Sequence, residues 1–145
     1  MDSSTLAALG GALVVIVLIG LAIAILLIIS MWKIFTKAGE PGWKAIIPYY
    51  NTYTMFKFSW KVNMFWVYLA VSIASSVFGR SQGFLGIIGM ICSLALIVLS
   101  IMSMYYLAKS FGKGAGFTVG LVLLSVVFVP ILAFGSAQYI GNTTE

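Results

Sequence analysis

The sequence predicts an all-α membrane protein with four transmembrane helices, and three observations support this prediction. The chain of 145 residues is 62% hydrophobic and 8% charged, with a mean hydropathy of +1.14. Soluble domains carry about 25% charged residues, so this composition cannot cover a water-facing surface. Long uncharged runs alternate with polar segments that are too short to fold separately in water. We therefore expect one integral membrane domain over residues 1–145.

The first span is expected over about residues 6–32. Its uncharged central run contains 18 residues and ends at Ile29, close to the roughly 20 residues that cross the hydrocarbon core. A cleaved signal peptide would place basic residues before a shorter apolar run. Here Asp2 precedes the run, and Trp32 and Lys33 follow it. We therefore expect this span to be retained.

Residues 36–61 are predicted to form two short helices in the cytoplasmic membrane interface. The segment combines lysines, aromatic residues and two prolines, and amphipathic rings and long cationic side chains settle where lipid headgroups meet water. Helical spacing gathers the aromatic residues on one side, with a bend at Pro48. We expect contact with the membrane interface or with a partner protein from Trp43, Lys44, Tyr49, Tyr50, Tyr53, Phe56 and Trp60.

Three further spans are expected over residues 62–78, 84–107 and 117–139. The first of these is near the lower length limit for crossing a bilayer. Pro130 lies within the last span and predicts a kink there, because proline removes a helical hydrogen bond. The polar tail over residues 141–145 is expected to be frayed.

The basic residues are distributed asymmetrically between the predicted loops. Seven of the eight lie before the second span or between the third and the fourth, and Arg80 alone lies on the opposite side. Because Lys and Arg are enriched in cytoplasmic loops, we expect the long basic loop to face the cytoplasm and both termini to lie outside the cell. The net charge of +5 flanks hydrophobic runs, which favours attraction to anionic lipid over binding of nucleic acid.

Small residues form stripes on the last two predicted spans. Such stripes let helix backbones approach closely in lipid. Packing within a four-helix bundle explains them, and an oligomer interface or a polar-lined path is the alternative. The residues expected at these contacts are Gly86, Gly89, Ser93, Gly112, Gly116 and Gly120.

The sequence contains no pattern typical of a catalytic, cofactor or metal site. Histidine is absent, and the single cysteine, Cys92, lies in an apolar run. The predicted spans carry no Asp, Glu, Lys, Arg or His at depth, which argues against an ion-coupled carrier. Residues 112–116 lack the spacing and the hydroxyl residue of a phosphate-binding P-loop. We therefore expect a protein that is not an enzyme and that needs no cofactor.

Two motifs resemble an uncharacterised family of small, four-span bacterial membrane proteins. The first motif is FTKAGEPGW at residues 35–43, and the second is LAKSFGKGAGF at residues 107–117. Members of that family are sometimes labelled signal peptidase I. A serine–lysine peptidase needs a nucleophilic Ser beside a desolvated Lys in an outward-facing domain, whereas every lysine here is predicted to be cytoplasmic. The resemblance implies a membrane protein and no established activity.

The function expected from these observations is that of a scaffold or accessory subunit in a membrane assembly. Its partners would be the lipid bilayer and either another membrane protein or further copies of the chain. A small oligomeric pore built on the serine and glycine faces is the alternative, because such faces let several helices surround a path.

Overall fold

The computed structural model describes residues 2–144, and all of its regular elements in that range are helices. The prediction of an all-α chain is therefore confirmed. The elements are α1 (Ser3–Lys37), the 3₁₀ helix η1 (Gly42–Ala45), α2 (Tyr50–Ser59), α3 (Val62–Phe78), α4 (Gly83–Ser110), α5 (Ala115–Leu123) and α6 (Ser125–Phe134).

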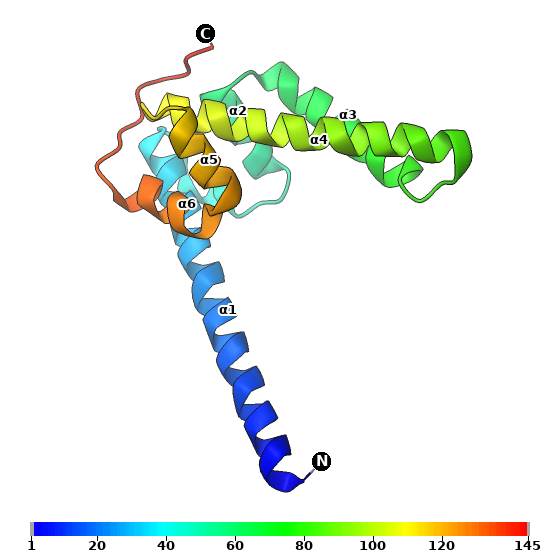
Figure 1. Ribbon diagram of the computed structural model, residues 1–145. Coiled ribbons are helices and arrows are strands. Elements are labelled where there is room, and N and C mark those ends of the chain that lie inside the picture. Colours follow the sequence, from blue (N-terminus) through cyan, green and yellow to red (C-terminus); the bar gives the residue numbers. More distant parts are fainter. Residues whose placement is uncertain (1, 145) are drawn as a thin grey trace.

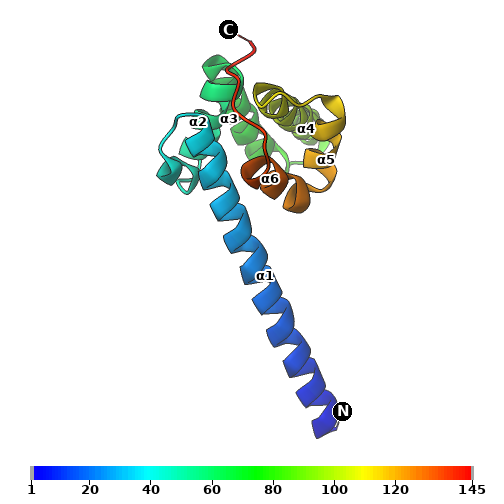
Figure 2. The ribbon, with the colours of Figure 1, turned by 90° about the vertical axis from the view of Figure 1, so that its left-hand side faces the viewer.

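The helices meet in one packed part, which we call the head (residues 30–65 and 103–144). Its core includes Phe35 from α1, Phe56 from α2, Leu107 from α4 and Leu132 from α6, all of them buried. From the head, α1 projects in one direction and the α3–α4 pair in another (Figures 1 and 2). This arrangement differs from the four-helix bundle that the sequence predicts, because α1 diverges from the paired helices α3 and α4 (Figures 1 and 2).

Helix α1 is a long apolar rod that touches the rest of the chain only near its C-terminal end. Asp2 caps its start by accepting a hydrogen bond from the Thr5 amide at 2.8 Å. The first buried residue is Ser30, more than seven turns along the helix. By length and composition, α1 and α4 are the two described helices that could each cross a membrane, and α3 and α6 are shorter apolar helices. The structure thus supports two of the four predicted spans by this criterion.

Helices α3 and α4 form an antiparallel hairpin. Gly89 of α4 lies against the backbone of Phe78, where an added Cβ would stand 2.6 Å from the carbonyl carbon. The hydroxyl oxygens of Ser75 and Ser93 lie 2.8 Å apart and form a hydrogen bond between the two helices. Small side chains therefore bring these helices into close contact, as they do in membrane helix pairs.

The region predicted as one span over residues 117–139 is instead two helices that pack against each other. The break lies at Leu124 (φ −132°, ψ 53°), and its carbonyl accepts hydrogen bonds from the amides that begin α6. Gly120 of α5 leaves room for the Phe128 ring of α6. Pro130 lies inside α6, so the break precedes the proline at which the sequence predicts a kink.

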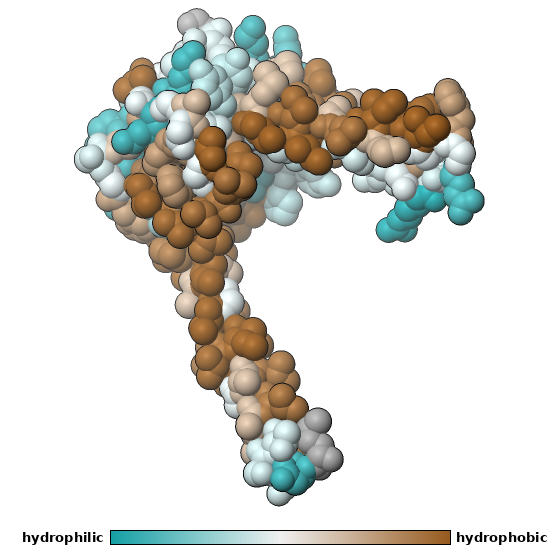
Figure 3. Space-filling view, viewed as in Figure 1, coloured by the Kyte–Doolittle hydropathy of each residue, from teal (hydrophilic) through white to brown (hydrophobic). Residues whose placement is uncertain are grey.

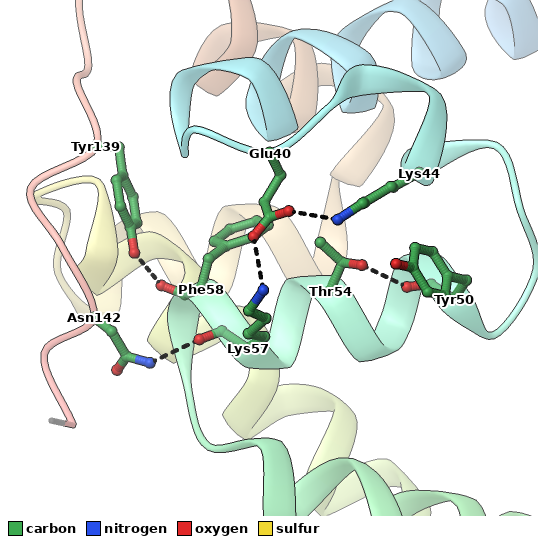
Figure 4. A network of polar contacts seen from close by, with 8 residues as sticks. All are labelled: Glu40, Lys44, Tyr50, Thr54, Lys57, Phe58, Tyr139 and Asn142. Atoms are coloured by element: carbon green, nitrogen blue, oxygen red, sulfur yellow. Dashed lines mark hydrogen bonds and ion pairs between the residues drawn. The ribbon is translucent and has the colours of Figure 1, made fainter.

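The C-terminal tail is held against the head, where the sequence predicts fraying. The Tyr139 hydroxyl donates to the Phe58 carbonyl, and the Asn142 side chain donates to the Lys57 carbonyl (Figure 4). The Asn142 side chain also donates to the Trp60 carbonyl. The Ile140 amide donates to the Ser110 carbonyl at 2.8 Å. The tail thus satisfies carbonyls at the C-terminal end of α2, which a helix leaves without internal partners. It lies beside the basic segment, not on the opposite side of the molecule.

Candidate membrane-interface and partner-binding site

Aromatic side chains from η1, from the start of α2 and from α3 form one surface, which we call the aromatic surface (Trp43, Tyr49, Tyr50, Tyr53 and Trp66); Tyr53 is partly buried in it and the other four are exposed. Trp43 and Tyr50 stack with ring centroids 6.1 Å apart. Tyr53 lies 6.1 Å from Tyr50 and 6.5 Å from Trp66, so the rings form a continuous series. Rings with an apolar body and a polar tip suit the boundary between lipid and water. The sequence prediction missed Trp66, which comes from α3 and joins the surface only through the fold.

Tyr49 is held in a backbone conformation that bulky residues rarely adopt. Its φ is 64° and its ψ is −41°, and the Tyr50 amide donates to the Pro48 carbonyl at 2.7 Å. These values define a strained γ-turn with positive φ. The turn begins α2 and leaves the Tyr49 side chain 66% exposed. Such strain persists only where the surrounding structure imposes it, and it is concentrated at functional sites.

Two residues expected on this surface lie in the core of the head. Phe56 is 1% exposed and Trp60 is 4% exposed. Trp60 stacks on Tyr106 of α4 at 5.0 Å, and Phe56 lies edge-on to Phe65 of α3. They are buried because α2 packs against both α3 and α4. The prediction that Phe56 and Trp60 face lipid or a partner is therefore corrected.

Glu40 connects η1 to α2 through two ion pairs (Figure 4). Its carboxylate oxygens lie 2.9 Å from the Lys44 ammonium and 3.4 Å from that of Lys57. The hydrogen bond from Lys44 lowers the pKa of the Glu40 carboxyl, and the charge of Lys57 lowers it further against the opposing effect of desolvation. The same hydrogen bond raises the pKa of Lys44. Lys44, predicted at the interface, is thus partly committed to holding the segment together.

Lys37 fixes the end of α6. Its ammonium donates to the carbonyls of Leu132 and Ala137 at 2.8 Å and to that of Gly135 at 3.3 Å. A cation is favourable at a helix C-terminus, where the unpaired carbonyls carry partial negative charge. This contact ties the end of α1 to the start of the C-terminal tail.

Of the other lysines of the head, three lie over aromatic rings, and Lys61 is exposed to solvent. The ammonium of Lys33 is 4.7 Å from the Phe134 ring centroid, and those of Lys109 and Lys113 are 5.7 and 5.8 Å from Tyr105 and Phe117. The head therefore carries seven of the eight basic residues. Figure 3 shows hydrophilic residues gathered on the head at the end opposite the α1 rod, whose sides are hydrophobic.

Comparison with known proteins identifies the family. A family of unknown function (DUF5684) matches residues 43–142. The chain belongs to this family. No curated protein and no solved structure matches the chain significantly. The resemblance to an uncharacterised family is thus confirmed, and the match covers the aromatic surface, the α3–α4 hairpin and most of the tail.

The small residues singled out from the sequence serve several different contacts in this DUF5684 chain. Gly89 and Ser93 lie between α3 and α4, and an added Cβ on Gly86 would meet the Ser81 carbonyl in the connecting turn. Gly112 ends α4 with a φ of 78°, a conformation that favours glycine. Two more belong to α5: Gly120 lies against the Phe128 ring, and Gly116 has open space around it.

Six of the twelve helix serines in the DUF5684 chain donate their hydroxyl to a carbonyl of their own helix: Ser30, Ser59, Ser72, Ser93, Ser103 and Ser110. Ser72 donates to the Tyr68 carbonyl at 2.8 Å, and Ser103 donates to the Ser100 carbonyl at 2.7 Å. Such back-bonding leaves little hydroxyl capacity for lining a water-filled path. The oligomeric pore therefore stays a prediction without a specific structural feature in its favour.

Proposed function

We propose that this DUF5684 protein is an integral membrane protein that serves as a scaffold or accessory subunit of a membrane assembly. One observation carries the proposal: the apolar rod of α1 is uncovered on all sides over residues 3–22. A helix that is hydrophobic all round is stable only when lipid or other protein surrounds it. The rest of the chain does not cover this part of α1, so lipid or another protein must surround it.

The length of α1 supports a spanning role. Its 35 residues correspond to about 52 Å at 1.5 Å per residue. The hydrocarbon core of a bilayer is about 30 Å thick. The helix can therefore cross the membrane and still reach into the head.

The arrangement of charges supports an orientation in which the head faces the cytoplasm. The head holds seven of the eight basic residues, and basic residues favour the cytoplasmic side. The C-terminal tail contacts Lys57 and Trp60 of the same head. We therefore propose that the tail is cytoplasmic too, with Asp2 on the other side. This revises the expectation that both termini lie outside.

The paired helices α5 and α6 support the same orientation. The start of α5 follows Lys113, and the end of α6 is held by Lys37, so both ends of the pair lie in the head. A pair of apolar helices that enters and leaves on one side is a re-entrant element, and it requires the backbone groups at its break to be paired. The Leu124 amide donates to the Gly120 carbonyl at 2.7 Å, and the Leu124 carbonyl accepts from the amides of Val127 and Phe128. We propose that residues 115–134, as the membrane-facing part of the head, dip into the membrane from the cytoplasmic side without crossing it.

The uncovered rod also offers contacts to a partner helix. Gly10, Gly11 and Gly20 have no atom within 4 Å of an added Cβ, so another helix can approach the backbone closely there. In this proposal α1 and the aromatic surface bind other membrane proteins or further copies of the chain. The protein acts by binding and not by catalysis.

A photo-crosslinking scan along α1 tests the proposal. A photoreactive amino acid is placed singly at each of positions 12–28 in cells that produce the full chain. We expect discrete protein adducts that recur every three to four positions, because one helix face meets the partner. Position 35 serves as control, since Phe35 is buried within the chain's own head. Adducts with lipid alone at every position would reduce α1 to an anchor and contradict the scaffold role.

A further inference from the structure

Two adjoining hollows form one open groove along α3. The hollow beside the aromatic surface, which we call the upper hollow, has a volume of about 620 Å³. It is lined by Tyr49, Tyr50, Tyr53, Phe65, Trp66 and Leu69. The lower one, of about 160 Å³, continues along α3 past Ile73 to Val77. Tyr49 and Leu69 line both hollows. The groove therefore runs from the aromatic surface toward the far end of the α3–α4 hairpin.

The dimensions and lining of the groove fit an acyl chain. From Phe65 to Val77 the helix rises about 18 Å, and one leaflet of the hydrocarbon core is about 15 Å deep. Leu69, Ile73 and Val77 follow at helical spacing along its floor. The Ser72 hydroxyl on this floor already donates to the Tyr68 carbonyl, which lessens its demand for water.

Tyr49 forms the wall that gives the groove its depth. Its side chain belongs to both hollows and is exposed, and its backbone is held in the strained γ-turn. A glycine would relieve the backbone strain at this position, because glycine adopts positive φ without steric cost. The fold therefore keeps a large ring at this strained position, although the exposed ring contributes little to the packing of the head.

Positive charge stands at the upper end of the groove. Lys61 is exposed, precedes the first turn of α3 and forms no ion pair among residues 2–144. Lys61 precedes Phe65 of the groove lining by four residues, about one helical turn, and no charged residue is among those that line the groove. This pattern complements a lipid with an anionic headgroup.

We propose that this groove binds one anionic phospholipid, with an acyl chain against Tyr49, Leu69 and Ile73 and the phosphate beside Lys61. The inference rests on the membrane placement proposed above. It adds a specific ligand site to that placement, because the groove combines shape, length and charge at one end.

Native mass spectrometry of the full chain in mild detergent tests the site. The added lipids are phosphatidylglycerol and phosphatidylcholine with identical acyl chains. We expect one retained phosphatidylglycerol per chain and about fivefold weaker retention of phosphatidylcholine, the effect of one lysine beside an anionic headgroup. Lys61→Gln should remove this preference, whereas Lys109→Gln, at an exposed lysine on α4, should keep it.

Variants of the groove itself test the acyl site. Ile73→Trp fills the lower hollow and should weaken retention of both lipids, whereas Ile97→Trp on α4 should not, although both isoleucines are 56% exposed. Tyr49→Gly should lose the lipid while keeping the thermal stability of the lipid-free chain, because it relieves strain. These variants leave α1 unchanged, so the crosslinking scan can succeed or fail independently.

Three results would overturn the site. Equal retention of the two lipids would show that the site does not recognise an anionic headgroup. Equal losses for Lys61→Gln and Lys109→Gln would show diffuse attraction to the basic head. Unchanged binding by Ile73→Trp would place the acyl chain elsewhere.

Discussion

Glu40 connects two parts of the head because its two carboxylate oxygens accept from lysines on different elements. Lys44 belongs to η1 and Lys57 to α2. Hydrogen bonds to charged groups contribute about 1.5–3 kcal/mol when they are shielded, and exposed ion pairs contribute about 0–1 kcal/mol. Because the Lys57 side chain is largely exposed, we expect the two ion pairs of Glu40 to contribute about 1 kcal/mol to the free energy of unfolding of the head.

Replacement of this carboxylate should therefore make the head less stable and less sensitive to acid. We expect Glu40→Gln to destabilise the head by about 1 kcal/mol at pH 7. The pKa of Glu40 is lowered from 4.5 in the folded chain. Its stabilising effect is thus complete above pH 4.5 and is lost as the pH falls through the folded pKa.

Thermal unfolding in detergent between pH 3 and pH 7 measures this effect. The melting temperature of Glu40→Gln should fall less on acidification than that of the unaltered chain. Asp2→Asn is the matched control, because the pKa of Asp2 is also lowered, by its hydrogen bonds with Thr5, but it lies outside the head. If Glu40→Gln and the unaltered chain lose stability in parallel on acidification, the ion pairs make no contribution.

The sequence correctly predicts that aromatic residues lie at the exposed surface of the head. It is less successful in predicting which individual aromatic residues do so. Tyr49 and Trp43 are exposed as expected, whereas Phe56 and Trp60 are buried. Apolar rings are favoured both in lipid and in a protein core, so helical spacing alone does not distinguish the two environments. The distinction comes from α3 and α4, which cover one side of α2.

Among the elements, the pair α5–α6 departs most from the sequence prediction. Hydropathy is continuous across residues 115–134, so length and composition indicate a single span. The break depends on tertiary contacts: the Phe128 ring packs over Gly120, and Lys37 holds the end of α6. By contrast, α3 coincides with the predicted span over residues 62–78, because a polar or glycine-containing turn bounds it on each side.

A leucine at Gly120 should disrupt this pair. An added Cβ there would overlap the Phe128 ring, and overpacking of this kind costs about 1–3 kcal/mol. Gly116→Leu is the control in the same helix, because no atom lies within 4 Å of its Cβ position, and its effect should stay within about 0.5 kcal/mol.

Thermal unfolding and native mass distinguish the two kinds of contact. Because Gly120 meets Phe128 of the same chain, the monomer should lose stability, and adding Phe128→Ala should recover part of the loss. A stable monomer that no longer forms an oligomer would instead place Gly120 between chains. A passive conductance abolished by Gly120→Leu would favour the pore.

In the whole molecule, the long helices diverge from a head that gathers the basic residues and the C-terminal tail (Figures 1 and 3). The asymmetry of basic residues is visible in the sequence, and it predicts the side on which the head lies. The location of the tail is not visible there, because it follows from donors such as Asn142 meeting the carbonyl groups that end α2. The location of the tail also changes the number of times the chain crosses the membrane. If α5 and α6 both return to the head, the two termini lie on opposite sides of the membrane.

Cysteine labelling tests this arrangement most directly. In a Cys92→Ser background, single cysteines replace the exposed residues Ser4, Thr36 and Thr143, and a membrane-impermeant maleimide is added to intact cells and to permeabilised cells. We expect position 4 to react in intact cells, and positions 36 and 143 to react only after permeabilisation. Reaction at position 143 in intact cells would mean that residues 115–134 cross the membrane, and reaction at position 36 would reverse the orientation of the head; either result would contradict a chain that keeps its head and tail together on the cytoplasmic side.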